Sequence, residues 1–519
     1  MDTKALRQKI LDLAIRGKLV LQDPNDEPAS VLLERIRAQK QQMVREGKLK
    51  SKDIKDDTVI FVGEDNLHYE KFADDSVKCI EDEIPFELPD GWAWLRLQSF
   101  IDFIGGSQPP KSTFEYSPSD DNIRLIQIRD YKTDKFMTFI PRDKARRFCS
   151  KNDVMIGRYG PPIFQILRGL EGSYNVALMK AVADPQIMLN DYLFYLLQDG
   201  ELLRMLESLS DRTCGQDGIN MYELNRYIVG IPPLNEQRRI IDFIEKAVPL
   251  VENVTKLKEE MSALIFQAKS KILDMAIRGR LVPQDPADEP ASLLLERIRA
   301  EKEELIKQGK IKRDKKESFI FRGDDNSYYL QTGNLIESLS DWGFDDLPDS
   351  WAICCLGEIC DYGNCINVET DSIDDDAWML DLEDIEKDTG KVLVRVKKRD
   401  RNAASTKHQF HAGQVLYSKL RPYLNKVVLA DQDGFCTSEI LPLEFECIVV
   451  PEYARYYLMS PAFLRYANHC SYGVKMPRLG TADGKKAIVP LPPYKEQERI
   501  VKAVHKTFAL LDSIAESLS

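Results

Sequence analysis

Few residues in this chain have the types and spacing that catalysis or metal binding requires. Its nearest approach to a metal site is a cysteine cluster of spacing CCx4Cx4C, formed by Cys354, Cys355, Cys360 and Cys365. Structural zinc sites favour the CxxC knuckle instead. In a second copy of this segment, identified below, the matching positions hold Leu95, Arg96, Ile101 and Gly106, none of them a usual metal ligand. We therefore predict buried thiols and no metal site.

Three other segments resemble catalytic motifs but lack their essential residues. GTADGKK at 480–486 is one residue shorter than a phosphate-binding loop and lacks its Mg²⁺-binding hydroxyl. GPPI at 160–163 lacks the polar amide and the aromatic ring of an adenine-methyltransferase NPPY motif. The acids at 374–376 are not followed by ExK, and the five histidines form no HExxH. The sequence therefore disfavours a nuclease, methyltransferase or zinc hydrolase acting alone.

Charge is unevenly distributed along the chain. Its 519 residues include 72 Lys and Arg against 84 Asp and Glu, and a net charge of −12 by itself argues against a nucleic-acid partner. However, residues 391–426 hold ten bases and one acid, and 124–168 hold eleven bases and four acids, whereas 341–388 hold sixteen acids and one base. Charge runs are commonly solvated surface. Two basic runs at matching places in a duplicated chain indicate a shared role.

The chain is duplicated. Residues 9–38 and 271–300 differ at five of thirty positions. Further along, LPDGW (88–92) matches LPDSW (347–351), and IPPLNEQRRI (231–240) matches LPPYKEQERI (491–500). Between these paired segments the copies diverge. Near-identical frames therefore enclose two different inserts, each large enough to fold as a domain.

The frames that must position these inserts have helical patterns. Apolar residues recur at three- and four-residue steps between Glu236 and Arg278, which indicates one long helix with a packed seam or a coiled coil. We predict that this helix is kinked by Pro249 and stopped by Gly279, and that a second helix spans Ala291–Ile306. The first twenty residues form an amphipathic helix rather than a secretory signal.

The inserts combine strand and helix patterns. Short β-rich runs include DVMIG (153–157), VLVRV (392–396) and QVLYS (414–418). Residues 191–209 and 451–469 have helical patterns. Each insert is therefore predicted to be a mixed α/β domain.

These motifs together resemble the specificity subunits of type I restriction-modification enzymes. The resemblance rests on the duplicated PPxxEQ closures, the AIRGxLVxQDPxDEPAS segments and the LPxxW openings. Each insert also carries a strand and turn similar to GDVLFSRxxP, here NDVMIGRYGPP (152–162) and GQVLYSKLRPY (413–423). The resemblance covers essentially the whole chain. One departure is Gln414, which replaces the acid that the first copy keeps at Asp153.

The resemblance implies an α+β fold. Two α/β target-recognition domains would be separated by long antiparallel, coiled-coil-like conserved helices in a pseudo-two-fold circular repeat, closed where the chain ends meet. The expected parts are an N-terminal helical region and linker (1–87), recognition domain 1 (88–231), a central helical region and linker (232–346), recognition domain 2 (347–491) and a C-terminal helix (492–519).

The resemblance also implies a non-catalytic DNA sequence-specificity subunit. Each recognition domain would read one half of a bipartite site in double-stranded DNA, while the helices set the spacing and dock two methyltransferase subunits. Restriction (translocase) subunits would add to this core. S-adenosylmethionine, ATP and Mg²⁺ are expected on the partner subunits and no cofactor in this chain. We expect no membrane partner and a prokaryotic cytoplasmic location. A protein-binding assembly scaffold without direct DNA readout remains the alternative.

Candidate DNA contacts follow from the chemistry of phosphates and base edges. Lys and Arg bind phosphate, and Arg, Asn and Gln read purine edges. In the first insert the candidates are Arg124, Gln127, Arg129, Lys132, Arg142, Lys144, Arg146, Arg147, Arg158, Tyr159 and Gln165. In the second they are Lys397, Lys398, Arg399, Arg401, Lys407, His408, Lys419, Arg421, Tyr423, Lys475 and Arg478. The acidic stretch 341–388 is expected to lie away from the phosphates or against a partner subunit.

Overall fold

The chain folds into two compact units, Met1–Leu257 and Lys258–Ser519. The computed structural model describes residues 2–48, 58–72, 74–160, 162–209, 218–309, 318–325, 327–340, 343–344, 346–401 and 405–518. No helix among these residues is long and apolar enough to cross a membrane. Each unit has its own large hydrophobic core, built where a frame helix meets an insert.

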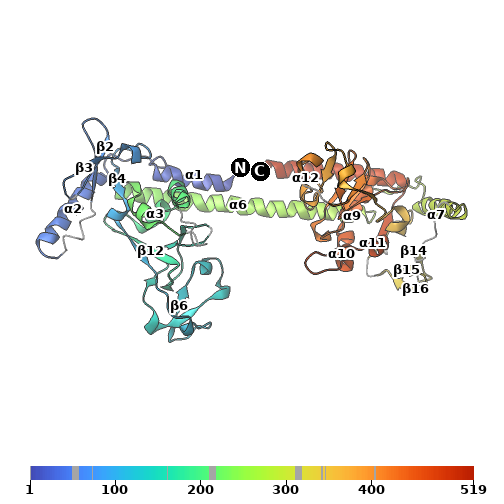
Figure 1. Ribbon diagram of the computed structural model, residues 1–519, viewed down its shortest axis with the longest axis horizontal. Coiled ribbons are helices and arrows are strands. Elements are labelled where there is room, and N and C mark those ends of the chain that lie inside the picture. The colour runs from blue at the N-terminus through green and yellow to red at the C-terminus, as the bar shows by residue number, and fades with distance from the viewer. Residues whose placement is uncertain are drawn as a thin grey trace. The chain divides into compact units, whose positions relative to one another are not determined.

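Unit 1 combines frame helices with a β-rich insert (Figure 1). Its helices are α1 (Thr3–Ile15), α2 (Ala29–Arg45), α3 (Asn190–Leu196), α4 (Gly200–Ser208), α5 (Met221–Arg226) and the first part of α6 (Leu234–Ala276). Its strands are β1 (Val59–Val62), β2 (His68–Lys71), β3 (Val77–Cys79), β4 (Ala93–Arg96), β5 (Ile101–Gly105), β6 (Asn122–Ile126), β7 (Phe139–Pro141), β8 (Phe148–Cys149), β9 (Val154–Gly157), β10 (Gln165–Leu167), β11 (Gly172–Tyr174), β12 (Leu178–Ala183) and β13 (Ile228–Ile231).

Unit 2 repeats this plan. Its helices are the last part of α6, α7 (Ala291–Lys307), α8 (Leu356–Ile359), α9 (Pro451–Met459), α10 (Pro461–Cys470), α11 (Thr481–Lys485) and α12 (Tyr494–Leu518). Its strands are β14 (Ser318–Arg322), β15 (Tyr328–Thr332), β16 (Leu335–Ser338), β17 (Ala352–Cys355), β18 (Ile366–Val368), β19 (Trp378–Leu380), β20 (Val396–Lys397), β21 (Lys407–Phe410), β22 (Val415–Ser418), β23 (Val427–Leu429), β24 (Gly434–Thr437), β25 (Ile440–Leu443) and β26 (Ile488–Leu491).

In unit 1 the frame is an antiparallel pair of helices. Thr255 donates a hydrogen bond of 2.7 Å to Thr3 at the start of α1. Past the other end of α1, Gln22 donates one of 3.1 Å to Glu236, near the start of α6. Since the start of one helix meets the later part of the other, α1 and α6 run in opposite directions, side by side (Figure 1).

Unit 2 has the same pairing. Lys269 of α6 forms an ion pair with Asp512 of α12, and Gln284 donates a hydrogen bond of 2.8 Å to Glu496. The predicted antiparallel frame helices are therefore confirmed in both units. The long helix has 43 residues with Pro249 inside it, and α7 matches the second predicted helix. Closure of the ring stays a prediction.

A glycine ends the frame segment in each unit. Gly17 and Gly279 have left-handed φ values of 65° and 66°. A Cβ atom at either glycine would lie 2.4–2.5 Å from the Cγ atom of Pro89 or Pro348, the proline of the LPxxW segment. The glycine therefore both reverses the chain and leaves room for the segment that opens the insert. The predicted helix stop at Gly279 is confirmed.

The glutamine of each PPxxEQ motif joins the frame to the insert. Gln237 is fully buried; it accepts a 2.8 Å hydrogen bond from the N–H of Leu189 and donates to the carbonyls of Ile187 (2.9 Å) and Pro232 (3.1 Å). The corresponding bonds of Gln497 are to Val450, Ile448 and Pro492, at 2.7, 2.9 and 3.0 Å. One side chain of the frame therefore holds the segment that enters insert helix α3 or α9.

The preceding glutamate is buried as well. Glu496 accepts hydrogen bonds from Gln284 (2.8 Å) and from the indole of Trp351 (3.1 Å), the tryptophan of LPxxW. Burial raises the pKa of Glu496, and these hydrogen bonds only partly oppose that shift. The pKa of Glu236 is raised by burial in the same way.

Each insert begins and ends in one antiparallel ladder. Strand β4 pairs with β13, and β17 with β26, so the LPxxW and PPxxEQ segments meet at the base of the insert. In unit 1 the insert strands form two four-stranded sheets, β10-β9-β12-β5 and β7-β6-β11-β8. Unit 2 has a five-stranded sheet, β18-β21-β24-β19-β20, and a three-stranded one, β23-β22-β25. The proposed limits 88–231 and 347–491 contain these ladders and stay a prediction.

Two sequence predictions for the inserts need correction. The run at 392–396 is not a strand, because only its last residue belongs to β20 and Leu393 and Val394 are exposed. The helical segment 191–209 is two helices separated at 197–199. Segment 451–469 also divides, at Ser460, whose side chain accepts a hydrogen bond at the start of α10.

Unit 1 has a buried ion pair whose two positions hold uncharged residues in unit 2. Arg96 of β4 donates to Glu70 at 2.6 Å, and both side chains are almost completely buried. Burial opposes ionisation of Glu70, but hydrogen bonds from Arg96 and Thr58 outweigh it and hold its pKa below the usual value. The strand registers place Leu330 and Cys355 at the corresponding positions of unit 2. Unit 2 therefore has an uncharged residue in place of each partner, so no buried charge remains at these positions without its counter-ion.

We expect Arg96→Ala to destabilise unit 1 by about 3–5 kcal/mol, because it leaves the carboxylate of Glu70 buried without a counter-ion. Amide exchange in β1–β4 should then accelerate by about two to four powers of ten in hydrogen–deuterium exchange. The double change Glu70→Leu with Arg96→Cys copies unit 2 and should exchange much more slowly than the single variant. Equal rates for the two variants would contradict this account.

The raised pKa of the buried Glu496 carboxyl means that the folded state binds this proton more tightly than the unfolded chain does. The contribution of this proton to the free energy of unfolding is therefore complete below the pKa of Glu496 in the unfolded chain, about 4.5. It declines as pH rises through the higher pKa of the folded state. We expect Glu496→Gln, which does not titrate, to gain melting temperature relative to the wild type between pH 4.5 and 7. Glu498→Gln, which removes an exposed charge from the same helix, is the control and should show no such trend.

Candidate nucleic-acid interface

The two GDVLFSRxxP-like segments form the same strand and turn. Asp153 accepts a hydrogen bond of 2.7 Å from the N–H of Ser150, just before β9. Gln414 accepts one of 2.9 Å from the N–H of His411, just before β22. The glutamine thus makes the same turn contact as the acid that it replaces, and the departure at position 414 leaves the local fold intact.

The loops that follow these strands have left-handed residues at matching places. Residues 158–164 connect β9 to β10, and residues 419–425 form most of the connection between β22 and β23; Pro161 lies outside the described residues. Both loops have two left-handed residues at matching places: Gly160 (94°) and Phe164 (57°) in the first, Arg421 (49°) and Asn425 (50°) in the second. Three of these are not glycine, and such strained backbone is typical of functional loops.

These matched loops carry cations without carboxylate partners in the described chain. Arg158 lies over the ring of Tyr159 at 5.4 Å, and its Nε atom is buried with no acceptor. Arg421 likewise has a buried Nε atom with no acceptor, and Lys419 beside it is half-exposed. Tyr423 is 50% exposed at the tip of the second loop. Each loop therefore offers positive charge that the fold itself does not neutralise.

Three further candidates belong with these loops. Gln165 donates to the carbonyl of Pro162 at 3.0 Å, which ties it to the first loop. Arg478 forms a bridge with Leu420, and its guanidinium donates to both oxygens of Glu439 at 2.8–3.1 Å. The exposed Lys475 lies on the same segment as Arg478. The structure therefore brings Lys419, Arg421, Tyr423, Lys475 and Arg478 together, with Arg478 already paired.

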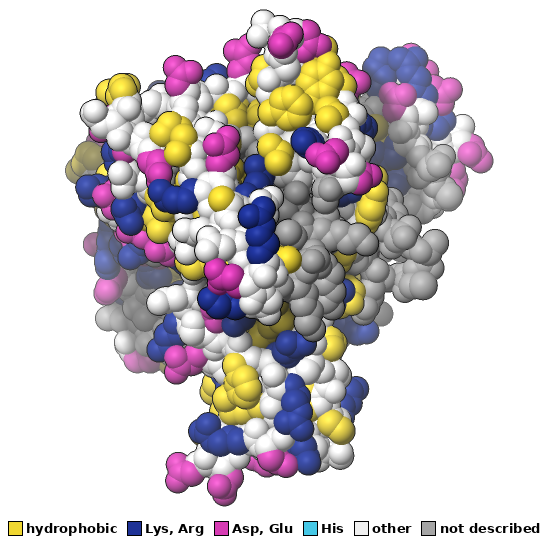
Figure 2. Space-filling view, turned by 90° about the vertical axis from the view of Figure 1, so that its left-hand side faces the viewer, with side chains coloured by type: hydrophobic (Ala, Val, Ile, Leu, Met, Phe, Trp, Pro, Cys, Tyr) yellow, Lys and Arg dark blue, Asp and Glu magenta, His cyan; other side chains and the backbone are white. Residues whose placement is uncertain are grey.

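The other candidates of the first insert lie on β6, β7 and their turns. Most of their groups are engaged: Arg124 with Asp134 (2.7 Å), Gln127 with Thr138 (3.2 Å), Arg129 over Phe136 (5.7 Å), Arg142 with the carbonyl of Asp120 (3.0 Å), Lys144 with Asp143 (3.0 Å) and Arg146 with the carbonyl of Asp143 (2.8 Å). Lys132 and Arg147 are exposed. Figure 2 shows Lys and Arg side chains on the lower lobe, where Figure 1 labels β6.

Part of the acidic stretch 341–388 pairs with the basic run that follows it, and its expected place away from phosphates or against a partner subunit stays a prediction. Asp376 pairs with Lys397 (2.8 Å) and Arg399 (2.9 Å), and Asp375 pairs with Lys398 (3.1 Å). The cause is chain geometry, since the turn before β19 meets β20, with which β19 pairs. Much of the positive charge at 397–399 is therefore neutralised within the insert.

Three candidates of the second insert are corrected by their burial. Arg401 is 11% exposed and is held by Asp384 at 2.7 Å. Lys407 and His408, in β21, are 5% and 7% exposed. The Nδ1 atom of His408 is 2.8 Å from the carbonyl of Ile440, and burial lowers its pKa, which favours the neutral ring. None of the three can reach DNA without rearrangement.

The cysteine cluster is structural. Cys354, Cys355 and Cys360 are buried, and Cys365 is half-buried. Burial raises the pKa of Cys355 to about 12, so its thiol stays protonated. The prediction of buried thiols is confirmed for the first three. Within the described ranges, no group of three or more His, Cys, Asp or Glu side chains could hold a metal ion.

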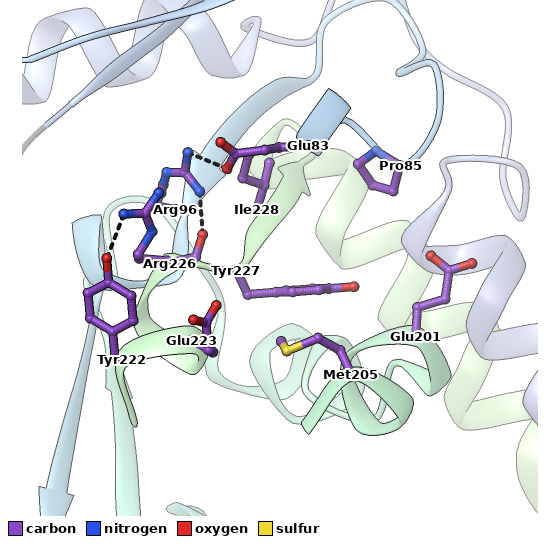
Figure 3. A pocket seen from close by; sticks show the side chains of 10 residues that line it. All are labelled: Glu83, Pro85, Arg96, Glu201, Met205, Tyr222, Glu223, Arg226, Tyr227 and Ile228. Carbon is purple, nitrogen blue, oxygen red and sulfur yellow. Dashed lines mark hydrogen bonds and ion pairs between the residues drawn. The ribbon is translucent and has the colours of Figure 1, made fainter. Parts of the chain in front are cut away.

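A polar cavity of about 640 Å³ lies at the base of the first insert (Figure 3). Its lining includes Arg96 and Arg226, and both arginines have partners: Glu83 at 2.8 Å for Arg96, and the hydroxyl of Tyr222 at 2.8 Å for Arg226. Tyr227 lies across the cavity and bonds to Asp199 at 2.9 Å. The cavity thus has no concentration of unpaired charge comparable to the matched loops.

Sequence analysis missed the apolar side chains beside the second loop. Tyr472, Val474 and Met476 are exposed among the cations that charge alone had identified. Apolar residues in a short segment between helices are normally predicted to be buried in the core. No feature of the sequence therefore indicated that these three side chains lie on the surface. Only the exposure itself reveals them.

The comparisons with known proteins agree with this architecture. The family of type I restriction modification DNA specificity domains matches residues 89–263 and 348–518. The EcoAI specificity subunit of Escherichia coli is 26% identical over 96% of this chain and 87% of its own length. The EcoEI specificity subunit of Escherichia coli is 29% identical over 69% of this chain and 61% of its own length.

A solved structure supports the fold alone. It is a chain from a study of complex assembly and conformational transition of the type I R-M system, with 17% identity and a TM-score of 0.52, and it covers 84% of this chain and 94% of that one. The relatives above are specificity subunits, which are the non-catalytic components of these complexes. Because the family model matches both inserts and the helices that follow them, the chain belongs to the specificity subunits of type I restriction-modification systems.

Proposed function

We propose that each insert reads one half of a bipartite site in double-stranded DNA. The observation that carries this proposal is the pair of matched loops, 158–164 and 419–425. They have left-handed residues at the same two positions in two divergent inserts, and each holds an arginine with no carboxylate partner among the described residues. Free guanidinium groups bind phosphate and guanine, so a common loop could hold DNA while different neighbours choose the bases.

The frames supply the second part of the proposal. Apolar side chains are exposed along the frame helices: Leu257, Met261, Leu264 and Phe266 on α6 and Leu510 and Ile514 on α12. Exposed apolar surface of this kind marks protein contacts. Since the frame is present twice, we infer that it docks two copies of one methyltransferase subunit and sets the spacing of the half-sites.

The remaining components belong to the partners in this proposal. Restriction subunits join the complex, S-adenosylmethionine, ATP and Mg²⁺ bind to the partner subunits, and the complex acts on DNA in the prokaryotic cytoplasm.

Methylation mapping tests the central claim. Single-molecule sequencing would be applied to DNA from cells that express the methyltransferase with or without this chain. A bipartite motif that disappears without the chain supports the proposal; methylation unaffected by the chain favours a scaffold that binds only protein.

Exchanging residues 93–230 for the corresponding segment of another specificity subunit should change one half-site and leave the other half-site and the spacing unchanged. The exchange keeps the frame helices, which are proposed to set that spacing. The same methylation mapping reads out the result. A motif altered in both halves would contradict independent reading by the two inserts.

Lys419→Ala with Arg421→Gly should weaken DNA binding and flatten the slope of log K against log salt by about one to two. Glycine is chosen because Gly160 occupies the matching left-handed position in the first insert. Lys397→Ala with Arg399→Ala removes the same charge from groups already paired with Asp376. This control should leave the slope nearly unchanged in equilibrium binding measured across a salt series. Equal slopes for the two variants would remove the 419–425 loop from the interface.

A further inference from the structure

A small hairpin in the second insert exposes apolar side chains to solvent. The backbones of Tyr472 and Arg478 bond to each other in both directions, at 3.0 and 3.1 Å, and so close the hairpin 471–479. Gly473, with a left-handed φ of 97°, allows the chain to turn within it. Val474 at the tip is completely exposed, and Met476 is 44% exposed. No other large apolar side chain in the described parts of the chain is as exposed as Val474.

The hairpin is fixed against the 419–425 loop. The N–H of Arg421 donates to the carbonyl of Pro477 at 2.7 Å, and the N–H of Leu479 donates to that of Lys419 at 3.0 Å. Arg478 reinforces this contact, because its guanidinium is held by both oxygens of Glu439. The apolar tip is thus presented from a rigid base, which is what a reading element needs.

Cations accompany the apolar tip. Lys475 lies on the hairpin, and Lys419 and Arg421 lie on the attached loop; none of the three has a carboxylate partner in the described ranges. Elsewhere in this insert several cations are neutralised by acids, as at Lys397 and Arg399. The three cations beside the apolar tip are not, so charge here favours an anionic partner. An apolar tip with cations around it matches a DNA groove, where phosphates surround base edges and thymine methyl groups.

We propose that the 471–479 hairpin enters a DNA groove in the second half-site. Val474 and Met476 contact base edges or a base step there, and Lys419, Arg421 and Lys475 bind the flanking phosphates. This inference rests on the proposed function and adds the element that determines sequence choice in the second insert. The cations hold any sequence, whereas the apolar side chains distinguish bases.

The test uses the full chain expressed with its methyltransferase subunit, with host genomic DNA as the substrate. Val474→Ser with Met476→Ser should have one of two effects. Either methylation of the motif falls at least tenfold, or base choice is relaxed at one or two positions, all of them in the half-site that exchange of residues 347–491 changes. Lys475→Ala should weaken binding equally at all sequences and lower the salt slope by about one. The matched control, Leu393→Ser with Val394→Ser, removes two exposed apolar side chains of the same insert and should have no effect.

The outcomes separate the two claims. If the wild-type chain specifies no motif, both the proposed function and the hairpin proposal fail. If it specifies a motif that Val474→Ser with Met476→Ser methylates at the wild-type rate, only the hairpin proposal fails. If that variant instead loses the methyltransferase in size-exclusion chromatography, the hairpin is a protein contact and the proposal is overturned.

Discussion

The buried glutamine of the PPxxEQ motif is the interaction on which the arrangement of each unit depends. Its side-chain amide supplies hydrogen bonds to one N–H and one carbonyl of the segment that leads into α3, and to one carbonyl of the PPxxEQ motif itself. Buried backbone groups without partners each cost about 1–3 kcal/mol, so no apolar residue could take this position cheaply. The neighbouring glutamate binds the glutamine of the QDP segment and, in unit 2, the tryptophan of LPxxW. One dipeptide thus joins three segments that lie far apart in the sequence.

This junction explains why frames and inserts have diverged at different rates. The frame contacts depend on particular side chains such as Gln237 and Glu496, so substitution of these residues would break specific hydrogen bonds. The shape of the matched loops depends less on side-chain identity. Asp153 and Gln414 satisfy the same kind of turn, and Gly160 and Arg421 take the same left-handed region with different side chains. The loop can therefore keep its shape while the groups that face a ligand change.

The sequence predicted the frames well because their information is local and repeated. Helix limits and the stop at Gly279 follow from apolar spacing and one glycine in a repeated segment, whereas the antiparallel pairing was expected from the family resemblance. Candidate contacts were predicted less well, since charge alone does not show whether a cation is paired. Lys397 and Arg399 meet acids twenty residues earlier only because β19 and β20 pair. Lys407 and His408 are polar residues in a strand that is covered on both faces, which no alternation pattern revealed.

The pairing of opposite charges also resolves the conflict between an acidic chain and a DNA partner. A net charge of −12 would repel DNA if it were spread evenly. In the second insert, however, the acids at 375–384 are paired with residues 397–401. Lys419, Arg421 and Lys475, which have no carboxylate partner among the described residues, lie on two connected segments. At physiological salt the screening length is about 8 Å. A phosphate at these segments would therefore respond mainly to these nearby cations, so the distribution of charge, rather than its sum, determines whether this surface can hold DNA.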